Sequence, residues 1–445
     1  MLLSRQIDGI PERIAGARGG VFIFRVGQVR YERDDVDKLF GQWDRMPECR
    51  NAEGKLYALC VKQPADIVGL CLYLRERGAG ALLLHEDTPY ERARESARLA
   101  GAAYLVYGTA ERFEAVSFMT ESQPASLCQF SSGTTGAPKL VRRTWEDIDE
   151  EIAGYNERLA AAGAAELPTQ VLVPVFHSFG LITGTLAAIA RGVEPNLLHG
   201  RNPKRILGEI RDTAGSLAYA VPFLLHLLLA LGKDEVRLNE VVSSGAPLTE
   251  PLLRRLERQT SRIWQQYGCT EAGCIALGAA PSSPQEMGRP LRRFRVSCEP
   301  LPGSRSEEPL TEIVAASART VVRTGDIGFL NAEGSLFVSG RADDLINVSG
   351  LKVMPSEVES VITAMAGVSE VVVCKSRHPV WGEAVQAWIA PADGALREQD
   401  VRAWCSERLP AYKVPGAIRL TNEIPRLPSG KISRRLLQTL EEERR

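Results

Sequence analysis

The sequence predicts an α/β protein with a large N-terminal domain and a small α+β C-terminal domain. Short apolar runs alternate with helical patterns over most of the chain, which is typical of βαβ units and of parallel sheets covered by helices. After about Pro290 short β-type runs follow one another between turns, and from Val353 onward the patterns fit a compact terminal unit. We therefore expect two βαβ subdomains, a small β subdomain and a mobile C-terminal domain, in that order.

The first βαβαβ pattern begins with the apolar run LYALCV at Leu56–Val61. It continues with a helix at residues 66–78, a strand at 81–86, a helix at 91–101 and a strand at 103–108. Three further strand–helix pairs follow this pattern. The strands are expected at 171–176, 217–222 and 240–245, and the helices that follow them at 181–192, 223–232 and 249–259. The stretch 217–232 is the most apolar of the chain, but Pro222 and His226 interrupt it and it is too short to span a bilayer. We interpret it as a buried strand, turn and helix.

The small β subdomain is predicted from three short runs, at residues 311–317, 320–326 and 335–340. The terminal unit contains a helix at 356–365, a strand at 368–375 and an amphipathic helix at 397–409. The domain joint is expected near the segment GRADD, residues 340–344. The two domains are therefore expected at residues 1–342 and 343–445.

Composition excludes some classes of protein. The 445 residues include 54 basic and 55 acidic side chains, so the chain lacks the basic excess of a nucleic-acid-binding protein. Nine cysteines without a CxxC pair, together with only five histidines, give no zinc pattern and favour packed, reduced thiols. The N-terminal apolar run breaks at Ser4 and Arg5, so it has no signal-peptide core. We expect a soluble cytoplasmic protein with no nucleic acid and no membrane as partner.

The strongest chemical signal is the segment QFSSGTTGAPKLVRRTW at residues 129–145. Glycines let successive backbone N–H groups converge on an anion, hydroxyls add donors and a lysine adds charge, which together suit an NTP phosphate chain. The spacing differs from the Walker A pattern, so a P-loop NTPase is disfavoured. Thr144 and Asp147 resemble a capping box at the start of the next helix. The candidate phosphate-binding residues are Ser131, Ser132, Gly133, Thr134, Thr135, Gly136 and Lys139.

Further motifs follow this loop in a fixed order. They are SSGAPLT at 243–249, QQYGCTEAG at 265–273, RTGDIG at 323–328, GRADDLINVSGLKVMPSEVE at 340–359 and LPSGKISRRLL at 427–437. With these motifs the chain, from about residue 50 to its C-terminus, resembles the adenylate-forming superfamily of acyl- and aryl-CoA synthetases, carrier-loading adenylation enzymes and luciferases. Each motif alone also fits an ordinary turn, linker or tail, so the order is what makes the resemblance specific.

The resemblance implies an ATP site and assigns its residues. Tyr267 would stack near adenine, Thr270 would contact phosphate, and Asp326 would accept both ribose hydroxyls. Glu271 would hold Mg²⁺, with Thr135 as a further metal-binding residue. Other nucleotide contacts are implied for Gly245, Ala246, Pro247, Gly268, Arg341 and Lys352.

The same resemblance implies the catalytic and moving parts. Lys431 would reach the reacting carboxylate and the α-phosphate, so that Mg²⁺, the phosphate loop and this lysine offset the repulsion between two anions. Asp343 would be the pivot of the C-terminal domain, and Gly350 would lie in the pantetheine passage. One domain rotation would then serve both half-reactions.

Two features depart from the family pattern. Only 55 residues separate Thr270 from Asp326, and the region before the phosphate loop is short, so we expect a somewhat trimmed N-terminal domain. Lys352 stands where many members carry an arginine, and a lysine keeps the charge but lacks the bidentate fork.

The acid pocket is expected around the segment PVFHSFG at residues 174–180. His177, also a candidate catalytic residue, stands where amino-acid-activating relatives carry an aspartate, so an α-amino acid is disfavoured. The segments PKLVRRT and AYKVP resemble aryl-acid ligases of siderophore pathways, although Ser178, Phe179 and Gly180 replace their usual Asn-Tyr-Pro. The predicted pocket residues are His177, Ser178, Phe179, Phe223, Gly245 and Gly268.

The predicted protein is an ATP- and Mg²⁺-dependent ligase that forms an acyl- or aryl-AMP and transfers it to a pantetheine thiol of CoA or of a carrier protein. An aryl acid of the hydroxybenzoate type, as used in siderophore or other secondary metabolism, is favoured. A medium-chain fatty acyl-CoA synthetase and a non-catalytic nucleotide-binding relative are the alternatives, and a luciferase-like oxygenase would share the first step. The acid, the acceptor and the oligomeric state stay open.

Overall fold

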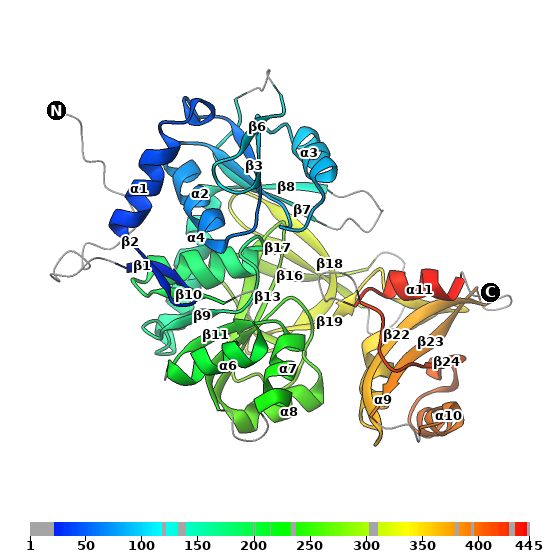
Figure 1. Cartoon of the computed structure of the whole chain (residues 1–445). Helices are drawn as coiled ribbons and strands as arrows, with labels where there is room; N and C mark the ends of the chain where they lie inside the picture. Colours follow the sequence, from blue (N-terminus) through cyan, green and yellow to red (C-terminus); the bar gives the residue numbers. More distant parts are fainter. Residues whose placement is uncertain are drawn as a thin grey trace.

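The computed structural model describes residues 22–117, 122–131, 139–198, 200, 202–213, 215–232, 237–301, 310–378, 382–392, 396–426 and 432–442. A large N-terminal body contains two sheets, and a smaller C-terminal body lies to one side of it beyond β19 (Leu336–Arg341) (Figure 1). This arrangement confirms the predicted fold class.

The first sheet has six strands in the described part of the chain. Their spatial order is β6 (Phe113–Ala115), β5 (Tyr104–Gly108), β3 (Leu56–Val61), β4 (Gly80–Leu83), β7 (Ser126–Ser131) and β8 (Lys139–Thr144). The four inner strands run parallel, and β6 and β8 close the edges antiparallel. All six residues of β3 are buried, as expected of a central parallel strand with helices on both faces.

Helices lie around this sheet, and all but the first of them were predicted from the sequence. They are α1 (Arg33–Trp43), α2 (Pro64–Glu76), α3 (Tyr90–Leu99) and α4 (Trp145–Ala161), with a short 3₁₀ turn η2 (Pro47–Cys49). The hydroxyl of Thr144 accepts a hydrogen bond from the backbone N–H of Asp147 at 3.2 Å, which confirms the predicted N-cap of α4. Ile148, Ile152 and Tyr155 lie on the buried stripe of that helix.

The second sheet includes the strands of the predicted small β subdomain in one continuous ladder. Its path among the described residues is β16 (Arg295–Pro300), β17 (Thr311–Ala316), β18 (Val321–Leu330), β19, β15 (Glu286–Pro290), β14 (Gly273–Ala279), β13 (Thr260–Cys269), β12 (Leu238–Ser243), β11 (Leu217–Ala220), β9 (Thr169–Val171), β10 (Pro195–Leu197), β1 (Phe22–Val26) and β2 (Val29–Glu32). Strands β10, β9, β11, β12 and β13 run parallel, whereas neighbours from β13 to β16 are antiparallel. Gly278 and Gly288 allow the close crossing of β14 and β15, because a Cβ on either would overlap the other backbone.

The helices of this half are α5 (Ala187–Ala190), α6 (Pro203–Asp212), α7 (Pro222–Gly232) and α8 (Glu250–Gln259). The last three lie together beside β11 and β12 and bury a common apolar cluster that includes Ile206, Leu228 and Leu253 (Figure 1). Helix α4 packs on the opposite face of the second sheet. There it belongs to the main apolar core, which contains residues of both sheets.

One predicted strand–helix pair differs from the structure. The strand expected at 171–176 ends at Val171, and residues 172–176 are mostly buried but outside the ladder. Pro174 has no N–H to give to a sheet. The helix that follows begins as a π-helix, η3 (Phe179–Leu186), in which the Thr185 hydroxyl donates to the Gly180 carbonyl at 2.7 Å. Single π-helical turns of this kind occur often at functional sites.

In its described residues the C-terminal body contains a five-stranded sheet with helices on both faces. Its strands are β21 (Leu351–Val353), β20 (Ile346–Val348), β23 (Gly382–Pro391), β22 (Val368–His378) and β24 (Ala417–Leu420), which pairs with β23. Its helices are α9 (Pro355–Thr363), α10 (Glu398–Ser406), the 3₁₀ turn η5 (Ala411–Lys413) and α11 (Arg434–Glu442). Val373 packs into the cluster beneath α9 and α10, and its neighbours Val372 and Cys374 pack toward α11, as the alternation of a strand requires.

Two further predictions can be compared with the structure. All nine cysteines are free thiols, and most are buried. No described helix combines the length and the apolar character that crossing a bilayer requires.

Candidate active site

Four of the predicted site segments lie at one edge of the second sheet. Segment 172–180 follows β9, Phe223 follows β11, Gly245 follows β12 and Thr270 follows β13. These four strands are parallel, so their carboxyl ends lie at the same edge, which is where α/β sheets bind ligands.

The phosphate loop joins β7 to β8. Ser131 and Lys139 are cross-strand partners at the ends of these antiparallel strands. Ser131 is half-buried and Lys139 is exposed. The predicted residues Ser132, Gly133, Thr134, Thr135 and Gly136 lie outside the described residues, as does Lys431.

Gln129 links this pair of strands to the predicted pocket segment, a role that the sequence reasoning missed. Its Nε2 donates to the Phe176 carbonyl at 3.0 Å, and its Oε1 accepts a hydrogen bond from the hydroxyl of Ser178. The only signal in the sequence is an amide in the otherwise apolar run LCQF. Gln129 therefore fixes the pocket segment of one sheet against the strand that leads into the phosphate loop of the other.

His177 lies beside an aromatic ring in a segment that is rich in aromatic contacts. Its exposed imidazole lies 4.7 Å from the ring of Phe176, which lies 4.6 Å from the ring of His85. Phe179, at the start of η3, lies 5.7 Å from the ring of buried Tyr219 on β11. The rings in these three pairs are inclined to one another by 52–55°, and tilted aromatic rings can pack edge-on against an aromatic acid.

The loop after β12 presents backbone to the site. Gly245, Ala246 and Pro247 are exposed, and Gly245 has φ of +83°, a conformation that glycine adopts without strain. The hydroxyl of Ser244 donates to the Gln266 carbonyl at 2.9 Å, which fastens this loop to β13.

Asp326 lies at the centre of the predicted ribose site. Its Oδ2 accepts a 2.6 Å hydrogen bond from the hydroxyl of Tyr267, and its Oδ1 lies 3.1 Å from Nη1 of Arg341. Burial raises the pKa of the Asp326 carboxyl, while Tyr267 and Arg341 act in the opposite direction. Each carboxylate oxygen has a second lone pair, so both can still accept a ribose hydroxyl.

Thr270 and Glu271 occupy the tight turn between β13 and β14, and both are half-buried. Gly268 stands at a bulge in β13, where a Cβ would overlap the Gly273 carbonyl. No three described His, Cys, Asp or Glu residues gather to hold a metal ion by themselves. A single carboxylate such as Glu271 fits Mg²⁺, which proteins commonly bind through one or two carboxylates together with substrate phosphates.

The segment around Asp343 contacts both bodies. Oδ1 of Asp343 lies 3.2 Å from Nε of Arg341, whereas its carbonyl accepts a 3.1 Å hydrogen bond from Lys375 of the C-terminal sheet. The next residue, Asp344, pairs with Arg434 of α11 at 2.9 Å. Gly350, with φ of +93°, and Lys352 are exposed on the hairpin of β20 and β21.

The structure places Phe223 between the two bodies. The ring is 48% exposed at the start of α7, and the guanidinium of Arg426 lies 4.8 Å from its centroid. Arg426 also pairs with Glu370 at 2.5 Å. The assignment of Phe223 to the acid pocket stays a prediction, and the contact with Arg426 is a role that the sequence did not indicate.

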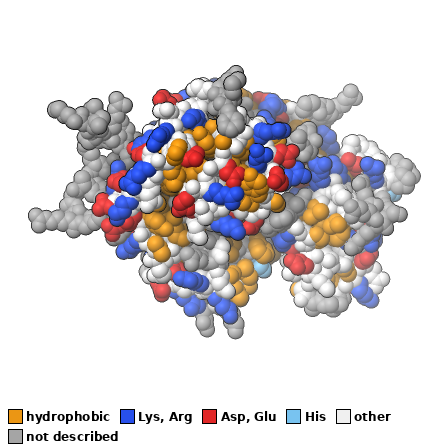
Figure 2. All heavy atoms as spheres, turned by 45° about the horizontal axis from the view of Figure 1, so that its top comes forward, with side chains coloured by type: hydrophobic (Ala, Val, Ile, Leu, Met, Phe, Trp, Pro, Cys, Tyr) orange, Lys and Arg blue, Asp and Glu red, His pale blue; other side chains and the backbone are white. Residues whose placement is uncertain are grey.

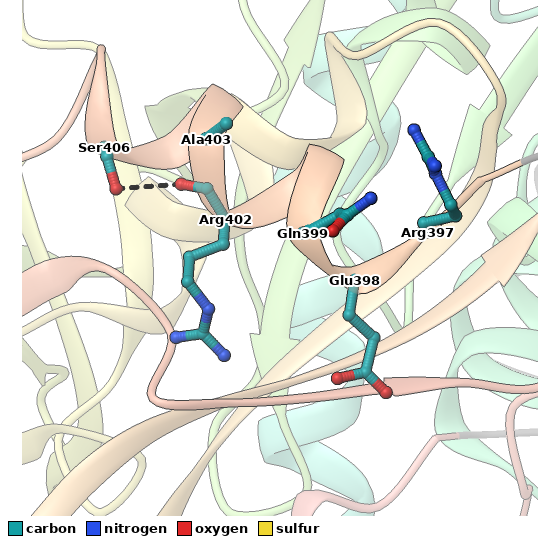
Figure 3. A pocket seen from close by; sticks show the side chains of 6 residues that line it. All are labelled: Arg397, Glu398, Gln399, Arg402, Ala403 and Ser406. Carbon is teal, nitrogen blue, oxygen red and sulfur yellow. Dashed lines mark hydrogen bonds between the residues drawn. The ribbon is translucent and has the colours of Figure 1, made fainter.

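The described part of the chain also has a hollow away from these motifs. An open hollow on α10 is lined by side chains outside every motif, including Arg397, Glu398 and Arg402 (Figure 3). On the face in Figure 2, basic and acidic side chains are interspersed.

The fold and the motif positions define an adenylate-forming enzyme, and comparison with known proteins places the chain in its family. Residues 65–298 match the AMP-binding enzyme family, and residues 357–431 match the AMP-binding enzyme C-terminal domain. The chain belongs to the AMP-binding enzymes and is an AMP-forming acid–thiol ligase, which confirms the predicted family and enzyme class.

Named relatives are carboxylic acid ligases. A 3,4-dihydroxybenzoate–[aryl-carrier protein] ligase of Bacillus anthracis is 40% identical over 416 residues, which cover 93% of this chain and 98% of that protein. A 2-succinylbenzoate–CoA ligase of Bacillus velezensis is 28% identical over 398 residues, covering 83% and 80%. ATP-bound MatB of Rhodopseudomonas palustris has the same fold, with a TM-score of 0.81 at 17% identity over 96% of this chain and 97% of that one.

Proposed function

We propose that this protein activates an aryl acid of the dihydroxybenzoate type with ATP and transfers the aryl group to the pantetheine thiol of an aryl carrier protein. The observation that carries the proposal is the 40% identity to a 3,4-dihydroxybenzoate–[aryl-carrier protein] ligase over nearly the whole of both chains. The ring contacts of Phe176 and Phe179 in the segment of His177, and the absence of an aspartate at position 177, agree with an aryl acid rather than an α-amino acid.

In the first half-reaction a carboxylate oxygen of the acid attacks the α-phosphorus of ATP. A new O–P bond forms, the bond to the β-phosphate oxygen breaks, and pyrophosphate leaves. Ser131, Lys139 and the loop residues Ser132, Gly133, Thr134, Thr135 and Gly136 bind phosphate in this proposal. Glu271 would hold Mg²⁺, and the bound ion would neutralise part of the negative charge. Lys431 binds the reacting carboxylate, and Asp326 accepts the ribose hydroxyls.

In the second half-reaction the thiol sulfur attacks the acyl carbon. A thioester bond forms, AMP leaves as the bond from the acyl carbon to the phosphate oxygen breaks, and the thiol proton passes to solvent. We propose that the C-terminal domain, residues 343–445, turns about Asp343 between the two steps. The double contact of Asp343, through its side chain to Arg341 and through its carbonyl to Lys375, supports a pivot at this residue.

Carboxylate-dependent ATP–pyrophosphate exchange tests the first half. We expect exchange with 3,4-dihydroxybenzoate to exceed exchange with benzoate and with octanoate. A preference for octanoate would favour the fatty-acid alternative, and ATP binding without exchange for any acid would favour a non-catalytic relative. A phosphopantetheinylated aryl carrier protein and CoA, offered separately, then identify the acceptor.

A further inference from the structure

A balanced cluster of four charged side chains is buried behind the Thr270–Glu271 turn. It consists of Arg143, Asp147, Glu151 and Arg293, with Arg143 and Arg293 side chains each 5% exposed and Glu151 1% exposed. Nη2 of Arg143 lies 2.7 Å from Oδ2 of Asp147 and 2.6 Å from Oε2 of Glu151. Arg293 pairs with the other oxygen of Asp147.

The cluster connects segments that are distant in sequence. Arg143 lies on β8, four residues after Lys139, whereas Asp147 and Glu151 lie on α4. Oε1 of Glu151 accepts a 2.7 Å hydrogen bond from the backbone N–H of Cys274, the second residue of β14. A single carboxylate thus joins the strand that leaves the phosphate loop to the strand that leaves the predicted magnesium turn.

Gly273 makes this close approach possible. It has φ of +72°, and a Cβ at this position would overlap both Nη1 of Arg143 and Oε2 of Glu151. The backbone of the turn therefore rests directly on the ion pair, two residues from Glu271.

We propose that Glu151 and Arg143 are positioning residues for Mg²⁺-bound ATP, holding Glu271 at a fixed distance from the phosphate loop. The inference rests on the proposed function, in which Glu271 and the loop bind the same phosphate chain. Groups that orient a metal-binding residue commonly change metal affinity or activity about 10- to 100-fold when altered. Glu271 and the phosphate loop must both be in position at once, because a misplacement of about 1 Å can lower the reaction rate by up to about 100-fold.

The test compares Glu151→Gln and Glu151→Asp with the wild type. A matched control is Glu240→Gln, since Glu240 is also buried in the N-terminal body, where it accepts a 2.7 Å hydrogen bond from Trp264 and lies 3.6 Å from Arg262. The primary readout is the ratio of ATP affinities measured by calorimetry with Mg²⁺ and with EDTA. The second readout is exchange as a function of Mg²⁺ concentration, with separate KM values for ATP and for 3,4-dihydroxybenzoate.

We expect Glu151→Gln to lose most of the Mg²⁺ effect on ATP affinity and to lower kcat/KM for ATP about 10- to 100-fold, with the KM for the acid changed by less than about threefold. Glu151→Asp keeps the charge, so its values in both readouts should lie between those of Glu151→Gln and the wild type. Glu240→Gln should match the wild type in both readouts. If Glu151→Gln does not fold, Glu151→Asp carries the comparison. A Mg²⁺ effect on ATP affinity in the Glu151 variants equal to that of the wild type would overturn the inference. Absence of exchange in the wild type would contradict the proposed function alone, because the affinity ratio does not depend on the acid.

Discussion

The hydroxyl of Tyr267 donates a 2.6 Å hydrogen bond to the buried carboxylate of Asp326, and Arg341 lies on the other oxygen of that carboxylate. Tyr267 belongs to the motif that the resemblance assigns to adenine, and Asp326 to the motif that it assigns to ribose. The two motifs are therefore physically joined, and the phenol orients the group proposed to accept the ribose hydroxyls.

This relationship predicts a pH dependence of ATP binding. Burial raises the pKa of Asp326, and its protonated form has lost one acceptor oxygen, so the KM for ATP should rise as the pH falls toward that pKa. Tyr267→Phe removes a hydrogen bond to the charged form, which raises the pKa further, so the rise should begin at a higher pH. Exchange rates measured across the acidic range at several ATP concentrations check this. Identical pH profiles for the two proteins would contradict it.

Gly273 and Gly163 form a matched pair for a stability test. Both have φ of +72°, but a Cβ on Gly163 meets nothing within 4 Å, whereas a Cβ on Gly273 overlaps Arg143 and Glu151. Gly163→Ala should therefore lower the free energy of unfolding only by the strain of the left-handed conformation, about 1–2 kcal/mol. Gly273→Ala should cost at least about 1 kcal/mol more, because it also displaces buried charges. Urea denaturation measures both, and equal losses would show that the ion pair tolerates the intrusion.

The contact between Arg426 and Phe223 predicts coupling between the two bodies. A cation–π contact of this kind contributes about 0.5–2 kcal/mol. Arg426→Gln and Phe223→Leu should each slow exchange by a few fold, and the double variant should be no slower than the worse single variant. Arg408→Gln is the control, because Arg408 stacks on Trp404 within the C-terminal body at 3.5 Å and should leave exchange unchanged. Fully additive effects of the two substitutions would mean that the contact does not operate during adenylation.

Glu271→Gln tests the proposed magnesium residue. The amide keeps the shape of the side chain but lacks the charge that a hard cation prefers, so the Mg²⁺ concentration for half-maximal exchange should rise about 10-fold or more. Excess Mg²⁺ should recover part of the rate. An unchanged Mg²⁺ requirement would assign the metal to other groups.

The elements that the sequence predicted are mostly present because their local patterns and their tertiary settings agree, whereas others, such as α6 and β13, were not predicted. The strand at Leu56–Val61 is reproduced residue for residue, and Thr144 caps α4 as its spacing with Asp147 indicates. The strand expected at 171–176 was wrong because the apolar run outweighed Pro174, a signal against a strand that the sequence does contain. The π-helix at Phe179–Leu186 has no such signal in the periodicity.

The site was predicted from motif order, whereas its connections were not. Gln129, Glu151 and Arg426 act through partners 47, 123 and 203 positions away, and pairings of that span leave no periodic trace in the sequence. The continuity of the β subdomain with the second sheet was missed for a similar reason, since it depends on the crossing of Gly278 and Gly288.

ATP–pyrophosphate exchange with 3,4-dihydroxybenzoate, followed by mass measurement of an aryl carrier protein after the same reaction, tests the central claim most directly. We expect exchange that depends on this acid, and a carrier heavier by one dihydroxybenzoyl group, bound as a thioester to its phosphopantetheine arm. Exchange with octanoate in its place, or a carrier left unmodified while CoA is acylated, would contradict it.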